Sequence, residues 1–97
     1  MARVVLAPAL TRWLPSTAGH AGGELGMQLA GDSVGELLEA VFARHPSLRG
    51  YVLDEQGAVR HHVAVFIDGQ CLRDKRDLGQ PVGEGAELYV MQALSGG

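Results

Sequence analysis

The segment over residues 33–45 constrains the fold most, because it carries the local signals of an amphipathic helix. Ser33 and Glu36 have the spacing of a capping box, in which both side chains bond backbone N–H groups at the helix start. The apolar residues that follow recur at helical spacing and form one stripe: Val34, Leu37, Leu38, Val41 and Phe42. Pro46 disfavours helical geometry in the residue before it. The sequence therefore predicts one main helix over residues 33–45.

Short stretches of alternating or continuous apolar residues flank this helix and predict strands. The predicted strands cover residues 4–8, 25–30, 62–67, 70–72 and 86–91. Asp68 and Gly69 form a dipeptide that favours a type I′ hairpin turn, so residues 70–72 are expected to return beside 62–67. Residues 11–24 and 47–61 are rich in turn-forming residues or lack a period, and are expected to be irregular.

This order of elements predicts an α+β domain. Two strands precede the helix, so the helix can cross one face of a mixed sheet of four to five strands. The first and last strands can then lie side by side in the sheet centre, which is the β-grasp arrangement. We expect a β-grasp domain over residues 1–91 and a flexible tail over residues 92–97.

The composition excludes several classes of protein. The chain has 97 residues, enough for one small domain, with eight basic and eleven acidic side chains and a net charge of −3. A dedicated nucleic-acid binder would show a basic excess, so no nucleic-acid partner is expected. No apolar run is long enough to cross a bilayer, and the N-terminal apolar stretch is too short for a signal peptide. We therefore expect a cytoplasmic protein without a membrane partner.

The residues that could bind a metal are few. Cys71 is the one cysteine, which excludes an internal disulfide and a cysteine-based metal centre. A lone cysteine is more often a small buried apolar residue than a nucleophile, and Cys71 is expected to be buried. His61 and His62 are adjacent, so on a strand they would point to opposite faces. No metal site is predicted.

The C-terminus carries the most distinctive chemistry. The last ten residues have no charged side chain, and the sequence ends in Gly96 and Gly97. A glycine backbone can pass through a narrow channel and adopt dihedral angles closed to other residues. Six extended residues reach roughly 20 Å, far enough to enter a partner's nucleotide site. The alternative is a frayed terminus with no function.

Four segments together resemble the ubiquitin-like sulfur-carrier proteins of the ThiS/MoaD type. They are residues 31–38, 63–69, 83–88 and 94–97. Residues 5–10, 60–63 and 66–69 are most similar to the cysteine-biosynthesis carriers of actinobacteria and to carriers in siderophore pathways. The molybdopterin-synthase small subunit usually has aromatic residues in its first strand, where this chain has Val4, Val5 and Leu6.

The resemblance implies a mechanism centred on Gly97. An E1-like enzyme would use ATP and Mg to adenylate the Gly97 carboxylate, and a sulfur donor would convert it to a thiocarboxylate. That sulfur would pass to an enzyme making cysteine, a siderophore or another sulfur metabolite, and a metalloprotease could trim or release the product. The chain itself would hold no cofactor and no catalytic residue. The alternatives are a molybdopterin-synthase small subunit or a protein modifier conjugated through Gly97.

Two further sets of residues are candidates for recognition by partners. In the tail, Leu94, Ser95 and Gly96 either contact the activating enzyme or only space the terminus. On the domain, a second apolar face is predicted to bind partners, although the loop before the second strand could cover part of it. This face comprises Phe66, Leu72, Tyr89 and Met91.

Overall fold

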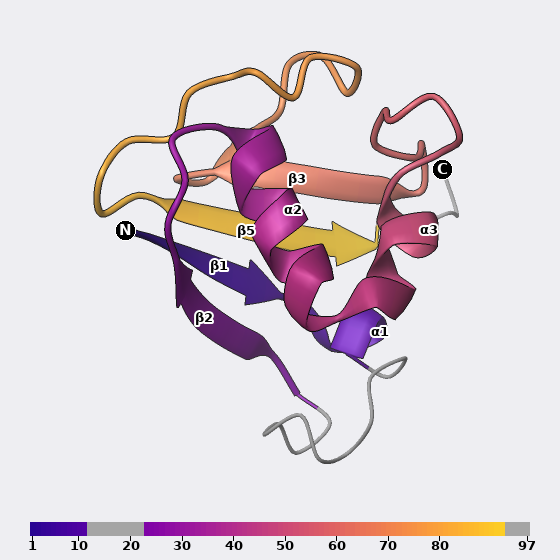
Figure 1. The fold of residues 1–97 in the computed structure, drawn as a ribbon, viewed down its shortest axis with the longest axis horizontal. Helices are drawn as coiled ribbons and strands as arrows, with labels where there is room; N and C mark the ends of the chain where they lie inside the picture. The colour runs from indigo at the N-terminus through magenta and orange to yellow at the C-terminus, as the bar shows by residue number, and fades with distance from the viewer. Residues whose placement is uncertain (12–22, 93–97) are drawn as a thin grey trace.

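A computed structural model describes residues 1–11 and 23–92, which form one mixed sheet crossed by a helix (Figure 1). The five strands lie in the order β2-β1-β5-β3-β4. Their bounds are Ala2–Leu6 for β1, Leu25–Leu29 for β2, Val63–Ile67 for β3, Gln70–Cys71 for β4 and Glu87–Gln92 for β5. β1 and β5 run parallel at the centre, and the other neighbouring strands are antiparallel. The predicted β-grasp arrangement is confirmed.

The main helix, α2 (Val34–Arg44), begins and ends where its caps predict. The Glu36 N–H donates to Ser33 Oγ at 3.2 Å, which fixes Ser33 as the N-cap. Glu36 Oε1 in turn accepts from the Asp32 N–H at 2.8 Å. In a regular capping box it would accept from the N–H of the N-cap residue, here Ser33. At the other end, the His45 N–H donates to the Val41 carbonyl at 2.8 Å.

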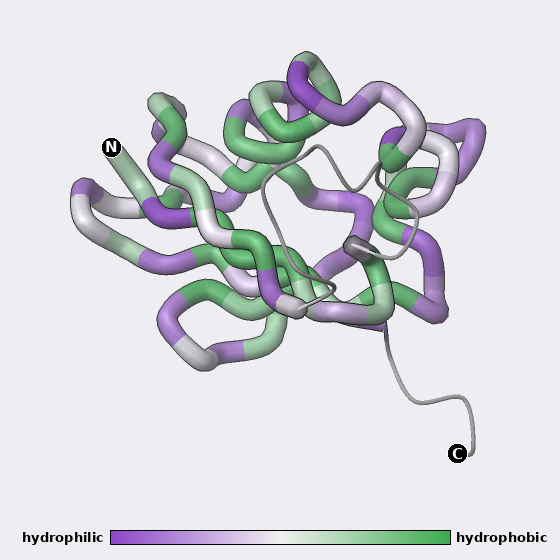
Figure 2. The backbone as a smooth tube through the Cα atoms, turned by 90° about the horizontal axis from the view of Figure 1, so that it is seen from below, coloured by the Kyte–Doolittle hydropathy of each residue, from purple (hydrophilic) through white to green (hydrophobic). Residues whose placement is uncertain are grey.

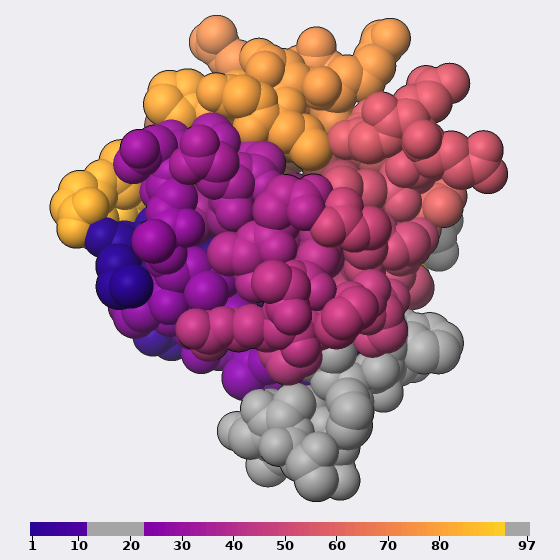
Figure 3. Space-filling view, viewed as in Figure 1, coloured from indigo at the N-terminus to yellow at the C-terminus, as the bar shows by residue number. Residues whose placement is uncertain are grey.

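The core lies between α2 and the sheet. The apolar stripe of α2 is buried against alternate residues of the strands, and Val4, Leu88 and Val90 have no exposed surface. Figure 3 shows that α2, α3 and the neighbouring loops cover this face of the sheet. Figure 2 shows hydrophilic residues gathered in the outer turns and hydrophobic residues along the middle of the strands. Within residues 1–11 and 23–92, no helix combines the length and apolar character needed to span a membrane.

Three short helical segments correct the sequence prediction. The first strand ends at Leu6, two residues earlier than predicted, and α1 (Pro8–Thr11) follows it. Residues 47–61, predicted as irregular, contain most of the 3₁₀ helix η2 (Pro46–Leu48) and all of α3 (Arg49–Val52). Proline suits the first turn of a helix because its φ is already helical. Segments of one turn are too short to produce a detectable apolar period.

The predicted hairpin turn is confirmed. Asp68 and Gly69 have φ angles of 49° and 85°, the left-handed values that a type I′ turn requires at both central residues. The returning strand is shorter than predicted and ends at Cys71.

Candidate functional site

The first part of the candidate site is the end of β5, from which the predicted reactive tail begins. β5 lies between β1 and β3, so its position is fixed from both sides. The Ala7 N–H donates to the Val90 carbonyl at 2.9 Å, close to the strand end. β5 continues to Gln92, one residue beyond the predicted strand. The predicted tail residues Leu94, Ser95, Gly96 and Gly97 lie outside the described residues.

A group of polar and aromatic side chains surrounds this strand end, and we call Tyr51, His62, Lys75 and Gln92 the exit cluster. The Tyr51 hydroxyl donates to Gln92 Oε1 at 2.8 Å. The His62 ring lies edge-on to the Tyr51 ring, with 5.2 Å between their centroids. Lys75 Nζ donates to the carbonyl oxygens of Arg60 and His61, at 3.3 and 3.0 Å. The cluster ties α3 and the turn before β3 to the end of β5.

Electrostatics in the exit cluster disfavour a charged His62. Desolvation lowers the pKa of His62 first, and the nearby charges of His61, Arg60 and Lys75 lower it further. His62 was expected to begin the strand over residues 62–67, but it lies with His61 in the turn before β3, and the two ring centroids are 5.8 Å apart. Among the residues that the structure describes, no group of three or more metal-ligating side chains could hold an ion.

The second part of the candidate site is the sheet face opposite α2, which we call the outer face. Phe66 of β3 pairs with Tyr89 of β5, and Ala64 pairs with Met91. Side chains paired in this way lie side by side on one face of a sheet. The three large side chains are half-buried, so they combine apolar area with access to solvent. The predicted grouping of Phe66, Tyr89 and Met91 on one face therefore agrees with the strand register.

Polar contacts border the outer face. The Tyr89 hydroxyl donates to Glu24 Oε2 at 2.8 Å. This hydrogen bond, followed by desolvation and the charges of Glu24 and Glu87, raises the pKa of Tyr89. Arg3 Nε lies 3.8 Å from Glu87 Oε2. The Arg3 guanidinium also lies against Gly26, where an added Cβ would come within 2.7 Å of Nη2. The outer face is therefore a half-buried apolar strip with a charged border.

Two predictions near the β3–β4 hairpin are wrong. Leu72, expected on the partner surface, is buried in the core with 6% of its surface exposed. Its N–H donates to the Val65 carbonyl at 2.8 Å, which holds it beside the helix-facing side of β3. Cys71, expected to be buried, is exposed. It pairs with Phe66 at the sheet edge, where no further strand of the described chain covers it.

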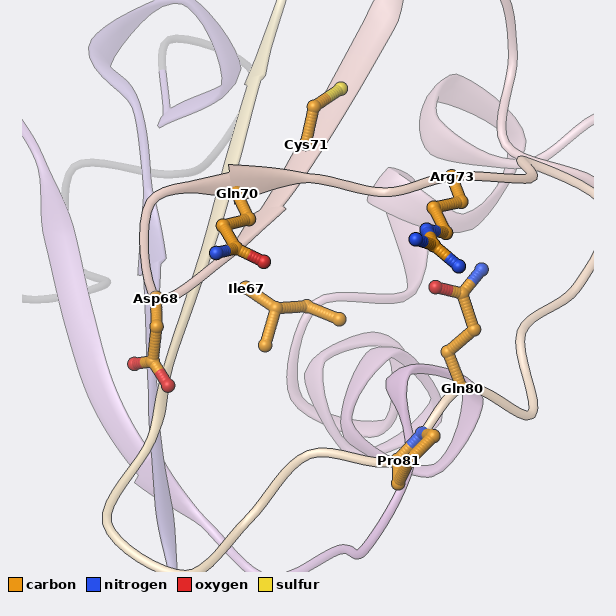
Figure 4. Close-up of a pocket in the computed structure, with 7 residues that line it drawn as sticks. All are labelled: Ile67, Asp68, Gln70, Cys71, Arg73, Gln80 and Pro81. Atoms are coloured by element: carbon orange, nitrogen blue, oxygen red, sulfur yellow. The ribbon is translucent and has the colours of Figure 1, made fainter.

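A shallow hollow of about 420 Å³ lies beside this hairpin (Figure 4). The Arg73 and Gln80 side chains point toward one another, while Cys71 Sγ points away from them. The hollow is at the opposite end of the sheet from the exit cluster, because Ile67 pairs with Leu88 whereas Val63 pairs with Gln92. It is therefore separate from the strand end that leads to the tail.

Comparisons of the sequence and of the structure with known proteins identify a family and a relative. The profile of the ThiS family matches residues 21–97. The small archaeal modifier protein 1 of Haloferax volcanii is 31% identical over 65 residues, which cover 67% of this chain and 70% of the relative. Its crystal structure superposes with a TM-score of 0.70 at 27% identity, covering 99% of this chain and 98% of that chain.

Two actinobacterial structures share the fold. The complex of BexX with CysO from Amycolatopsis orientalis contains a chain matching with a TM-score of 0.68 and 23% identity, over 97% of this chain and 99% of that one. CysO from Mycobacterium tuberculosis matches with a TM-score of 0.72 and 16% identity, over 94% and 99%. At these low identities the similarity shows a shared fold and carries no conclusion about function.

The sequence missed the exit cluster. Tyr51 lies in a segment without periodicity, and its partner Gln92 is 41 residues away. No sequence signal could have found it, because the pairing of Val63 with Gln92, which places the residues just before β3 at the end of β5, is seen only in the structure.

Proposed function

We propose that this chain, which belongs to the ThiS family, is a sulfur carrier that is activated at the carboxylate of Gly97. The observation that carries the proposal is the family match, which extends through Gly96 and Gly97. The central position of β5 supports it, because the strand leading to the tail is held on both sides and can present the tail from a rigid domain.

The proposed chemistry uses two displacements, both in the active site of an E1-like enzyme. A Gly97 carboxylate oxygen attacks the α-phosphorus of Mg-ATP, and pyrophosphate leaves. Hydrosulfide then attacks the acyl carbon, and AMP leaves with the bonding electron pair. The product is a C-terminal thiocarboxylate, which a biosynthetic enzyme uses as its sulfur source. This chain acts as a substrate, and its glycine tail supplies an unhindered acyl group.

The outer face is our proposed docking surface for these enzymes. Phe66, Tyr89 and Met91 offer half-buried apolar area, and aromatic and methionine side chains are enriched in protein interfaces. The Amycolatopsis structure contains CysO in complex with BexX, and docking of this chain onto a sulfur-accepting enzyme is part of the proposal. In the tail, we assign recognition by the activating enzyme to Leu94, Ser95 and Gly96.

The first test is the intact mass of the chain after incubation with the E1-like enzyme of its organism, Mg-ATP and sulfide. We expect a gain equal to sulfur minus oxygen, located in the C-terminal peptide. Oxidation of methionine or cysteine adds a nearly equal mass, so the location is essential. A Cys71→Ser variant makes the test sharper, because alkylation then reports the thiocarboxylate without the exposed Cys71 thiol.

Deletion of Gly97 is the matched control. The truncated chain should gain no sulfur, and its melting temperature should stay unchanged because Gly97 has no side chain that could pack in the core. A wild-type C-terminal peptide that stays unmodified, with an activating enzyme that is active on another carrier, would refute the proposal.

A second candidate function is conjugation to other proteins, which the name of the Haloferax relative favours. A lysine amine would then attack the acyl carbon of the Gly97 adenylate in place of hydrosulfide, so that an amide forms and AMP leaves. Lys75 is the one lysine of the chain, and its Nζ donates to two backbone carbonyls. We therefore expect single conjugation without chain growth through Lys75. Denaturing gels of cells expressing the tagged chain, with the Gly97 deletion as control, would reveal such adducts.

A further inference from the structure

The last described residue of β5 is held by a side chain from a distant helix. The Tyr51 hydroxyl donates to Gln92 Oε1 at 2.8 Å, in a partly buried hydrogen bond. Tyr51 is half-buried and packs against the core, so contacts with the core hold its ring in place. Strand ends usually fray because their backbone groups lose partners. Here the strand end has a side-chain anchor in addition to its backbone pairing.

The rest of the exit cluster limits the freedom of Tyr51. The His62 ring contacts the Tyr51 ring edge-on. The turn that carries His62 is held by Lys75 Nζ, which donates to the carbonyl oxygens of the two preceding residues. Desolvation and neighbouring positive charges lower the pKa of His62, which favours its neutral form. A neutral ring packs against Tyr51 without the cost of desolvating a charge. The anchor of Gln92 is thus supported from two loops.

We propose that Tyr51 is a positioning residue for activation of the tail, and this role rests on the proposed function. Through its bond to Gln92, Tyr51 holds the end of β5, which is the part of the domain nearest in sequence to the tail. An enzyme that must capture the tail then has less chain to order, and ordering each residue costs conformational entropy. Tyr51 touches neither the acyl carbon nor the nucleotide, so its effect is on capture of the tail.

The test compares Tyr51→Phe with two variants in an ATP–pyrophosphate exchange assay with the E1-like enzyme of the organism. Tyr51→Phe removes the donor and keeps the ring. We expect KM for the chain to rise about five-fold, the equivalent of one neutral hydrogen bond, with kcat almost unchanged. Gln92→Ala should raise KM to the same extent. The double variant should add nothing further, because both changes break one contact.

Val52→Ala is the matched structural control. Val52 is a buried neighbour on the same helix, so its truncation destabilises the domain without removing the bond to Gln92. Its KM should match that of the wild-type chain. If Val52→Ala raises KM as much as Tyr51→Phe, the effect is general loss of stability and the positioning role is wrong.

Amide hydrogen exchange on the chain alone gives a second readout. Tyr51→Phe should speed exchange several-fold at Met91, which pairs with Ala64 near the strand end, and leave Tyr89, which pairs with Phe66 further along the strand, unchanged. Unchanged exchange at Met91, or a wild-type KM in Tyr51→Phe, would overturn the inference, provided that sulfur transfer to the wild-type chain still proceeds. A wild-type chain that is not adenylated would refute the proposed function, and the role of Tyr51 with it.

Discussion

The two faces of the sheet differ in burial and in polarity. On the face toward α2, Val4, Leu88 and Val90 are fully buried and apolar, and their register places them together. On the outer face, Phe66, Tyr89 and Met91 are half-buried, and charged residues such as Arg3 border them. A uniform face is what the core needs. A mixed, half-exposed face suits reversible contact with other proteins. Its charged residues limit aggregation, and its apolar residues are removed from water when a partner binds.

The largest expected effect is a difference in the free energy of unfolding between a variant of the core face and a variant of the outer face. Leu88→Ala should reduce the free energy of unfolding by about 2–5 kcal/mol, because it leaves a cavity in the core. Met91→Ala, a similar truncation on the same strand, should cost about 1 kcal/mol or less, since Met91 is only half-buried. Urea denaturation of both variants measures the difference. Equal losses would contradict the division into a buried core face and a half-buried outer face.

The next effect tests the hairpin that brings Cys71 beside Phe66 on the outer face. Gly69 has a φ of 85°, which an L-residue adopts only with strain. Gly69→Ala should therefore cost about 1–2 kcal/mol. Gly83→Ala is the control, because Gly83 lacks a positive φ and an added Cβ there meets no atom within 4 Å. Thermal unfolding of both variants is the measurement, and a Gly69→Ala domain as stable as Gly83→Ala would argue against the turn's importance.

A smaller effect on the free energy of unfolding is expected at the N-cap of α2. Ser33→Ala removes the acceptor for the Glu36 N–H and should cost about 1 kcal/mol. Ser47→Ala, at an exposed site in η2, should be neutral. Amide exchange in the first turn of α2 should rise only in Ser33→Ala. A rise in both variants would mean that the cap is not the cause.

The smallest effect is a pH dependence arising at the exit cluster. The pKa of His62 is lower in the folded domain than the value of about 6.5 in an unfolded chain. Between these two values the unfolded chain binds more protons, so stability rises with pH in this window. The contribution of a neutral His62 is complete above about pH 6.5 and is lost as pH falls through the folded pKa.

His62→Gln should therefore show a flatter dependence of melting temperature on pH than the wild-type chain between about pH 5.5 and 7.5. Parallel curves for the two proteins would show that His62 does not titrate differently on folding.

The sequence predicted those parts of the molecule that depend on local chemistry. The Ser33 cap, the apolar stripe of α2 and the Asp68–Gly69 turn each follow from neighbouring residues, and all three are present. Apolar alternation also predicted which residues of β3 and β5 face the core. The single-turn helices α1 and α3 were missed because tertiary packing of Leu10 and Val52, rather than a sequence period, holds them in place.

The candidate site was harder to predict, because it depends on contacts between distant residues. Phe66, Tyr89 and Met91 were predicted together from strand alternation, which is a local signal. Leu72 was misplaced although the predicted two-residue turn already pairs Phe66 with Cys71, which puts Leu72 on the opposite face. Cys71 was misplaced because exposure at a sheet edge depends on strand order. The bond from Tyr51 to Gln92 joins segments that no sequence pattern relates.

The parallel pairing of β1 with β5 has a consequence for how the protein is made. Val4 pairs with Leu88, so the centre of the sheet can close only after nearly the whole chain has left the ribosome. Contacts between residues so distant in sequence form slowly. The α2 helix and the β3–β4 hairpin can form earlier, but their apolar sides stay uncovered until β5 arrives. A nascent chain that stops before β5 leaves β1 without its central partner and is exposed to proteolysis. A folded sheet with this strand order is thereby restricted to chains whose translation has run through β5.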